Sequence, residues 1–186
     1  MRRAITITAV LGALILASAP AGAQQVLSPY RDQQFTMIRG LTDAELGELK
    51  NGTGMGLARA AELNGYPGPR HVLDTVAGGQ LHVTPEQNRR VEQIFEDMAG
   101  KARSLGDQII AEETALDMAF RAGTIDEKDL HSRVSRIAVL RGELRVVHLR
   151  AHLETRALLS SAQIDRYNEL RGYTGDSKQP ERHQHH

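Results

Sequence analysis

The chain has 186 residues, with 23 basic and 23 acidic side chains, three phenylalanines, four tyrosines and neither cysteine nor tryptophan. This charge balance argues against a general nucleic-acid surface, and without cysteine no disulfide can stabilise the fold. Stability must therefore come from aliphatic side chains packed between helices. The sequence contains no Gly-x-Ser-x-Gly or His-Glu-x-x-His motif and no other catalytic constellation, so we expect no enzymatic activity.

Residues 1–23 have the three parts of a cleaved secretory signal peptide. Two arginines precede an uncharged, largely apolar run at 4–17, and residues 21–23 read Ala-Gly-Ala, a cleavage site that leaves Gln24 as the new N-terminus. The apolar run is shorter than the ~20 residues that a membrane-spanning helix needs. We therefore expect export to the periplasm and a mature chain without an integral membrane segment.

Glycine and proline interrupt the next segment, residues 24–82. Short helices fit between these breaks at about 42–50, 56–64 and 70–77, and a capping-box pattern at Thr42 opens the first of them. This segment is therefore predicted to be irregular, with short helices and flexible joints.

Residues 83–172 instead predict a helical hairpin domain. Thr84, with Gln87 three residues later, forms a capping box, and Pro85 suits the first helical position. Two rows of apolar residues then recur every seven positions along a helix that should end near Gly123: Val91, Met98 and Leu105, and Phe95, Ala102, Ile109 and Leu116. Such rows are typical of a seam that packs on another helix.

A second long helix is expected to begin at Thr124, whose Thr-x-x-Glu spacing again suggests a capping box. Its apolar rows are Leu130, Ile137, Leu144, Ala151 and Leu158, and Leu140 and Val147. The short turn between the two helices makes them antiparallel. A further capping pattern at residues 159–163 opens a last short helix, and residues 173–186 are predicted to be a disordered tail with three histidines.

The expected fold is therefore all-α, a long antiparallel helical hairpin with short flanking helices. Because a hairpin alone buries little surface, either dimerisation or folding of residues 24–82 over the seam must supply further contacts. We favour an intertwined homodimer.

The two segments at 83–87 (VTPEQ) and 159–163 (LSSAQ) resemble the repeated Leu-Thr-x-x-Gln motif of the Spy/CpxP family, which includes periplasmic chaperones and heavy-metal sensor and resistance proteins. The similarity covers about residues 80–171. It implies an all-α periplasmic dimer without enzymatic activity, which either binds unfolded proteins without ATP or responds to metals. The glycine-rich stretch at 52–69 has no counterpart in that resemblance.

His148 and His152 lie one helical turn apart, a spacing that places two imidazoles on one face as a two-ligand metal clip requires. A hairpin folded at residues 123–124 would bring Met98 and Glu96 near them. Methionine, histidine and carboxylate together suit zinc or copper. No cofactor is required by any motif, and the alternative is a pair of partly exposed histidines on a charged helix.

The second long helix also carries a row of arginines. They are Arg133, Arg136, Arg141, Arg145 and Arg150. Interspersed acids favour simple solvation and pairing between helices, whereas the resemblance implies a cationic face that binds clients or partners.

Three functions follow from these patterns. The first is an ATP-independent chaperone for unfolded envelope proteins, and the alternative is a periplasmic protein that binds or senses zinc or copper. A helical module for one specific envelope partner is the third. The sequence does not decide between them and names neither the client nor the metal.

Overall fold

The computed structural model describes residues 27–173, in which every regular element is helical. The predicted signal peptide and residues 174–186 of the predicted tail lie outside the described residues. The elements are η1 Arg31–Phe35, α1 Asp43–Asn51, α2 Arg59–Glu62, α3 Pro69–Ala77, α4 Pro85–Ala122, α5 Glu127–Leu158 and α6 Ser161–Leu170. Residues from Gln33 onward form one compact unit, and residues 27–32 belong to another. Among the described helices, none has the length and apolarity needed to cross a membrane.

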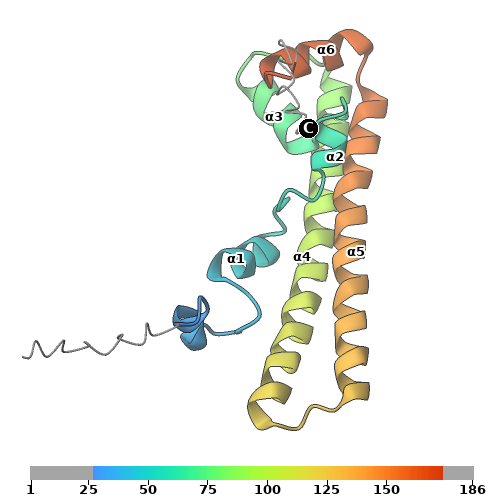
Figure 1. Cartoon of the computed structure of the whole chain (residues 1–186). Coiled ribbons are helices and arrows are strands. Elements are labelled where there is room, and N and C mark those ends of the chain that lie inside the picture. Colours follow the sequence, from blue (N-terminus) through green and yellow to red (C-terminus); the bar gives the residue numbers. More distant parts are fainter. Residues whose placement is uncertain (1–26, 174–186) are drawn as a thin grey trace, which may run out of the picture. The chain divides into compact units, whose positions relative to one another are not determined.

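The long antiparallel hairpin is confirmed. Figure 1 shows α4 and α5 side by side, joined by the turn at residues 123–126, with α2, α3 and α6 gathered at the opposite end. At the start of α4, the Thr84 side chain accepts a hydrogen bond from the Gln87 N–H, and the Gln87 side chain accepts one from the Thr84 N–H. At its end, Gly123 adopts a left-handed conformation with φ 64°, which glycine tolerates without steric cost.

The predicted start of the second long helix is wrong by two residues. The N–H of Thr124 donates to the Ala119 carbonyl at 3.1 Å and completes the end of α4. Asp126 instead caps α5, since its carboxylate accepts the Asp129 N–H at 2.7 Å. Both residues are common at helix N-caps, and Asp126, not Thr124, caps α5 because its carboxylate reaches the N–H of the third helical residue.

The two motif glutamines hold the base of the hairpin together. Gln87 and Gln163 form a reciprocal amide pair, with both N–H···O distances 3.0 Å. Gln87 also donates to the Leu158 carbonyl at 2.7 Å, and Gln163 donates to the His82 carbonyl at 3.0 Å. Each glutamine therefore caps its own helix and links the starts of α4 and α6 to the end of α5.

Replacing Gln87 with alanine should lower the free energy of unfolding by about 1–3 kcal/mol, because the Leu158 carbonyl and the Gln163 amide lose their partner. Urea unfolding would measure the change. Gln93→Ala on the exposed side of α4 is the matched control, expected within about 0.5 kcal/mol of wild type. Equal losses in the two variants would contradict this role of Gln87.

Residues 36–81 cover one face of the hairpin. In one core cluster Ile38, Leu41 and Leu49 pack on buried side chains of α4 and α5; in the other, Val72 and Leu81 pack with Val91, Leu159 and Tyr167. This layer supplies contacts that the hairpin alone lacks, which is one of the two solutions expected from the sequence. The homodimer stays a prediction.

The layer also changes which residues of α4 are buried. The buried residues are Val91, Ile94, Ala99, Ala102, Gly106 and Ile109, whereas Phe95, Met98, Leu105 and Leu116 of the predicted rows are half-buried. The heptad rows assumed a single partner helix, but α4 contacts α1 and α3 as well as α5, so its buried face is wider.

The short helices follow the predicted pattern with one difference. α1 and α3 lie within one residue of their expected bounds, whereas the helix expected at 56–64 is reduced to Arg59–Glu62. Met55 and Gly56 have positive φ values of 46° and 70°, which a right-handed α-helix does not contain. A turn at residues 55–58 therefore replaces the first part of the expected helix.

Candidate metal-binding cavity

His148 and His152 are buried on the face of α5 that lies under the short-helix layer. Their relative exposures are 3% and 9%, so the alternative of partly exposed histidines is wrong. With Met98 of α4 and His71 of α3, both line a cavity of about 400 Å³, here called the histidine cavity. Three helices distant in sequence thus bring three imidazoles and one thioether to the same hollow.

A hydrogen bond to the Tyr66 backbone fixes the orientation of the His152 ring. Its Nδ1 lies 2.7 Å from the Tyr66 carbonyl oxygen, and because a carbonyl can only accept, Nδ1 carries the proton and donates. Nε2 therefore keeps its lone pair. A histidine whose outer N–H is held by a carbonyl or carboxylate is the usual arrangement of a metal ligand.

Gly68 makes room for this ring. A Cβ atom at residue 68 would lie 2.9 Å from Cε1 and 3.1 Å from Nε2 of His152, closer than side chains tolerate. Gly68 also lines the histidine cavity. Gly68, which directly precedes α3, therefore leaves space for the ring nitrogen of His152.

The other imidazole of α5 has an unsatisfied atom. Nε2 of His148 is buried and has no hydrogen-bond partner within the described part of the chain. Burial, and next the neighbouring His152, lower the pKa of His148, so at neutral pH the ring is uncharged. Leaving a buried polar atom unpaired costs about 1–3 kcal/mol. An uncharged, unpaired ring nitrogen beside a cavity fits a metal ligand.

The pKa of His71 is also lowered, first by burial and then by the nearby charge of Arg171. Burial therefore disfavours the charged form of both His71 and His148.

Acid should destabilise the metal-free protein. Since the folded-state pKa of His148 lies below the ordinary value of about 6.5, the unfolded chain binds more protons in acid, and the free energy of unfolding falls as pH drops below ~6.5. Urea unfolding at pH 7.5 and 5.5 would show this loss, which His148→Leu should reduce. The exposed His131→Leu on the same helix is the control; an identical pH dependence in both variants would contradict the account.

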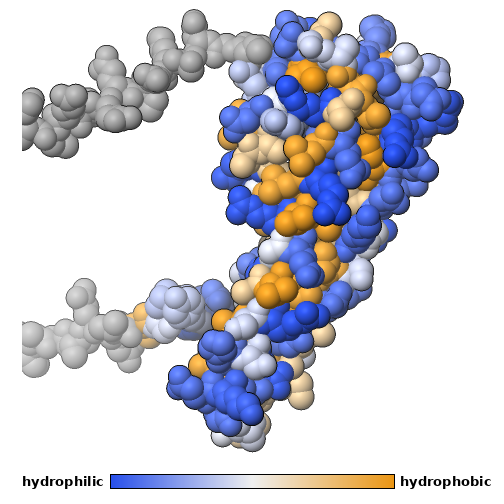
Figure 2. Space-filling view, turned by 90° about the vertical axis from the view of Figure 1, so that its right-hand side faces the viewer, coloured by the Kyte–Doolittle hydropathy of each residue, from blue (hydrophilic) through white to orange (hydrophobic). Residues whose placement is uncertain are grey.

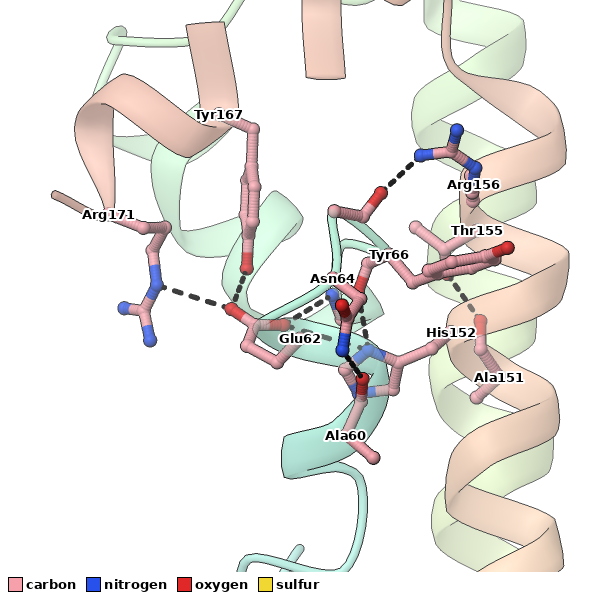
Figure 3. Close-up of polar contacts among 12 residues, drawn as sticks. Ala60, Glu62, Asn64, Tyr66, Ala151, His152, Thr155, Arg156, Tyr167 and Arg171 are labelled. Atoms are coloured by element: carbon pink, nitrogen blue, oxygen red, sulfur yellow. Dashed lines mark hydrogen bonds and ion pairs between the residues drawn. The ribbon is translucent and has the colours of Figure 1, made fainter. Parts of the chain in front are cut away.

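Glu62 of α2 lies beside the Nδ1 side of the His152 ring, as Figure 3 shows. Its Oε1 accepts the Tyr167 hydroxyl at 2.5 Å and pairs with Arg171 Nε at 3.4 Å. Its Oε2 accepts the Gly68 N–H at 3.1 Å and lies 3.6 Å from Nδ1 of His152. The carboxylate therefore ties α6 and the Gly68 turn to the outer side of the His152 ring.

Arg156 holds the same turn from α5. Its guanidinium donates to the Gly65 carbonyl and lies 4.6 Å over the Tyr66 ring. The turn that orients His152 is thus fastened to the helix that carries His152 (Figure 3).

Comparison with protein families identifies the family of this chain. The model of the heavy-metal resistance family matches residues 49–166. The chain belongs to the heavy-metal resistance family. That family lies within the Spy/CpxP-like helical group, so the resemblance found in the sequence is confirmed. No curated protein and no solved structure matches the chain.

The matched segment of this heavy-metal resistance family member contains His71, Met98, His148 and His152. Of the four predicted ligands, His148, His152 and Met98 meet at one cavity. Glu96 does not line it and is exposed, because two residues along a helix turn a side chain to the opposite side. His71 was not among the predicted ligands, because the irregular segment that carries it shows no ligand spacing.

The described residues show no group of three or more histidine, aspartate or glutamate side chains close enough to hold a metal ion. The predicted set of ligands therefore stays a prediction, to which the structure adds the positions of the side chains and the orphaned nitrogen of His148.

Three of the five arginines in the predicted client-binding row have polar partners, and the binding role of the row stays a prediction. Arg133 pairs with Asp129 and Arg141 with Glu113, both at 2.9 Å, and Arg136 donates to Gln108 at 3.3 Å. Arg145 and Arg150 are exposed. The first three arginines are engaged in pairing, as the simpler interpretation expected.

Proposed function

We propose that this chain is a periplasmic heavy-metal-binding protein that serves metal resistance or sensing, and that it takes its metal ion in the histidine cavity. The observation that carries the proposal is the buried, unpartnered Nε2 of His148 beside a cavity that His152 and Met98 also line. Membership of the heavy-metal resistance family supports it.

His148 and His152 would bind the ion from one face of α5, with Met98 and His71 available from α4 and α3. Imidazole and thioether ligands suit copper and zinc better than calcium or magnesium. Because these side chains come from three helices, an ion held among them stabilises the folded state over the unfolded chain.

Thermal unfolding of the metal-stripped mature chain, with and without added zinc or copper, tests the proposal. At a metal concentration 100 times the dissociation constant, the folded state gains about 2.7 kcal/mol, which for a chain of this size raises Tm by about 5–10 °C. The His148→Ala/His152→Ala double variant should lose this rise. The control His131→Ala should keep it, and a rise that survives in the double variant would refute the site.

A second function is supported by the uncovered side of the hairpin. Val139, Val146 and Leu153 recur every seven residues along α5 and are 52%, 50% and 57% exposed. Figure 2 shows apolar side chains in an interrupted stripe on this side of the molecule. Val139 and Val146 line a groove with Lys101 and Arg150, which suits the capture of unfolded proteins or docking of a second copy of the chain.

Light scattering of an unfolded client diluted with metal-free mature chain, without ATP, tests this second function. Suppressed aggregation that Val146→Glu abolishes would support it, and suppression unchanged by that substitution would remove the groove from consideration. Sedimentation of the same two proteins would show whether the groove joins two copies.

A further inference from the structure

We infer that the histidine cavity selects soft monovalent cations, Cu(I) or its analogue Ag(I), over Zn(II) and other divalent ions. The inference rests on the proposed function and adds the class of ion. It comes from the donors and the charges that line the cavity.

The available donors are soft or borderline and uncharged. His148 and His152 offer imidazole nitrogens and Met98 offers a thioether sulfur; His71 lines the same cavity, but no three histidine, aspartate or glutamate side chains of the described residues are close enough to hold one ion. A thioether is a ligand that Cu(I) favours. Zinc sites use histidine, thiolate and carboxylate ligands, so the Met98 sulfur is the donor that separates the two ions. None of these side chains brings a negative charge that would offset the charge of the ion.

The charged side chains that line the cavity are positive. Arg70 and Arg103 lie among the lining residues, which include no carboxylate in the described chain. Arg70 is compensated by Asp74 at 3.0 Å, whereas Arg103 has no ion-pair partner among the described residues. Since Coulomb repulsion scales with charge, a divalent ion meets twice the repulsion that a monovalent ion meets at the same place.

Glu62, the carboxylate nearest to His152, is not among the residues that line the cavity and is itself paired with Arg171. Glu62 lies on the Nδ1 side of the ring, 3.6 Å from that nitrogen, and its oxygens are occupied by Tyr167, Arg171 and the Gly68 N–H. Its charge is shared with Arg171. The donor nitrogen of His152 is the one at the Gly68 wall of the cavity.

Competition titrations of the metal-stripped mature chain measure the selectivity directly. Ag(I) in a nitrate buffer, Cu(I) under anaerobic conditions and Zn(II) would each be titrated against a chromophoric chelator of known affinity. We expect Ag(I) and Cu(I) to bind at least ~100-fold more tightly than Zn(II) at the cavity. Zinc binding that equals or exceeds silver binding, and that His148→Ala abolishes, would overturn the inference and leave the proposed function standing.

Two substitutions distinguish the effect of the Met98 thioether from the effect of the Arg103 charge on the selectivity. Met98→Leu should weaken Ag(I) and Cu(I) by ~10-fold or more and leave Zn(II) nearly unchanged, because it removes only the soft donor. Met118→Leu, at an exposed methionine of the same helix, is the control. Arg103→Gln should strengthen Zn(II) more than Ag(I), because it removes repulsion that acts twice as strongly on the divalent ion.

The remaining outcomes are also informative. Tight silver binding that neither Met98→Leu nor His148→Ala weakens would place the ion elsewhere and overturn both the inference and the proposed site. No binding of any of the three ions would overturn both as well.

Discussion

Replacing Gly106 with alanine is expected to lower the free energy of unfolding by about 2–4 kcal/mol, because α1 can no longer sit on α4. A Cβ atom at Gly106 would lie 2.1 Å from the carbonyl oxygen of Leu49 and 2.8 Å from its carbonyl carbon. These are backbone atoms of α1, which cannot rotate away as a side chain can. The clash can be removed only by moving α1, and this would displace Leu49, which is 1% exposed and part of the core.

The same helix provides a matched control. Gly100 lies in α4 with nothing within 4 Å of its added Cβ, so Gly100→Ala should raise the free energy of unfolding by up to ~1 kcal/mol through helix propensity. Urea unfolding of the two variants should therefore give opposite signs. A Gly106→Ala protein as stable as wild type would mean that α1 does not lie on α4 as described.

Replacing Gly68 with alanine is expected to weaken metal binding by ~10–100-fold. The backbone at Gly68 has φ −79° and ψ 140°, which alanine adopts without strain, so the effect comes from the Cβ atom against Cε1 and Nε2 of His152. The ring must turn or shift, and either movement displaces its donor nitrogen. Competition titration of the variant would give the change in affinity.

Gly54→Ala is the control for this substitution. Gly54 lines the same cavity, and nothing lies within 4 Å of its added Cβ. It should bind metal within ~3-fold of wild type, as expected for a substitution without a clash. Equal losses at the two glycines would indicate that the volume of the cavity, and not the ring of His152, sets the affinity.

The sequence was informative about local structure because the signals there are local. The capping boxes at Thr42, Thr84 and Ser160 each form as predicted, since each depends on residues only three positions apart. The all-α class and the hairpin follow from these caps and from the apolar rows. The start of α5 was misplaced because Thr124 and Asp126 carry competing signals of the same kind.

The candidate site was predicted in part, for a physical reason. The spacing of His148 and His152 is a property of one helix and could be found in the sequence. Their burial, and the arrival of His71, depend on how residues 59–77 cross the hairpin, which no periodicity encodes. Glu96 was chosen for its proximity to Met98 along the chain, although the helical period turns it toward solvent.

An anomalous difference map from crystals of the metal-loaded mature chain would show directly whether a metal ion binds in the histidine cavity. We expect a peak among His148, His152 and Met98, at about 2.0–2.1 Å from ring nitrogen when the ion is zinc. The same map from the His148→Ala/His152→Ala variant should be empty there. A peak only at surface side chains or at the histidines of residues 183–186, with the cavity empty, would contradict the account.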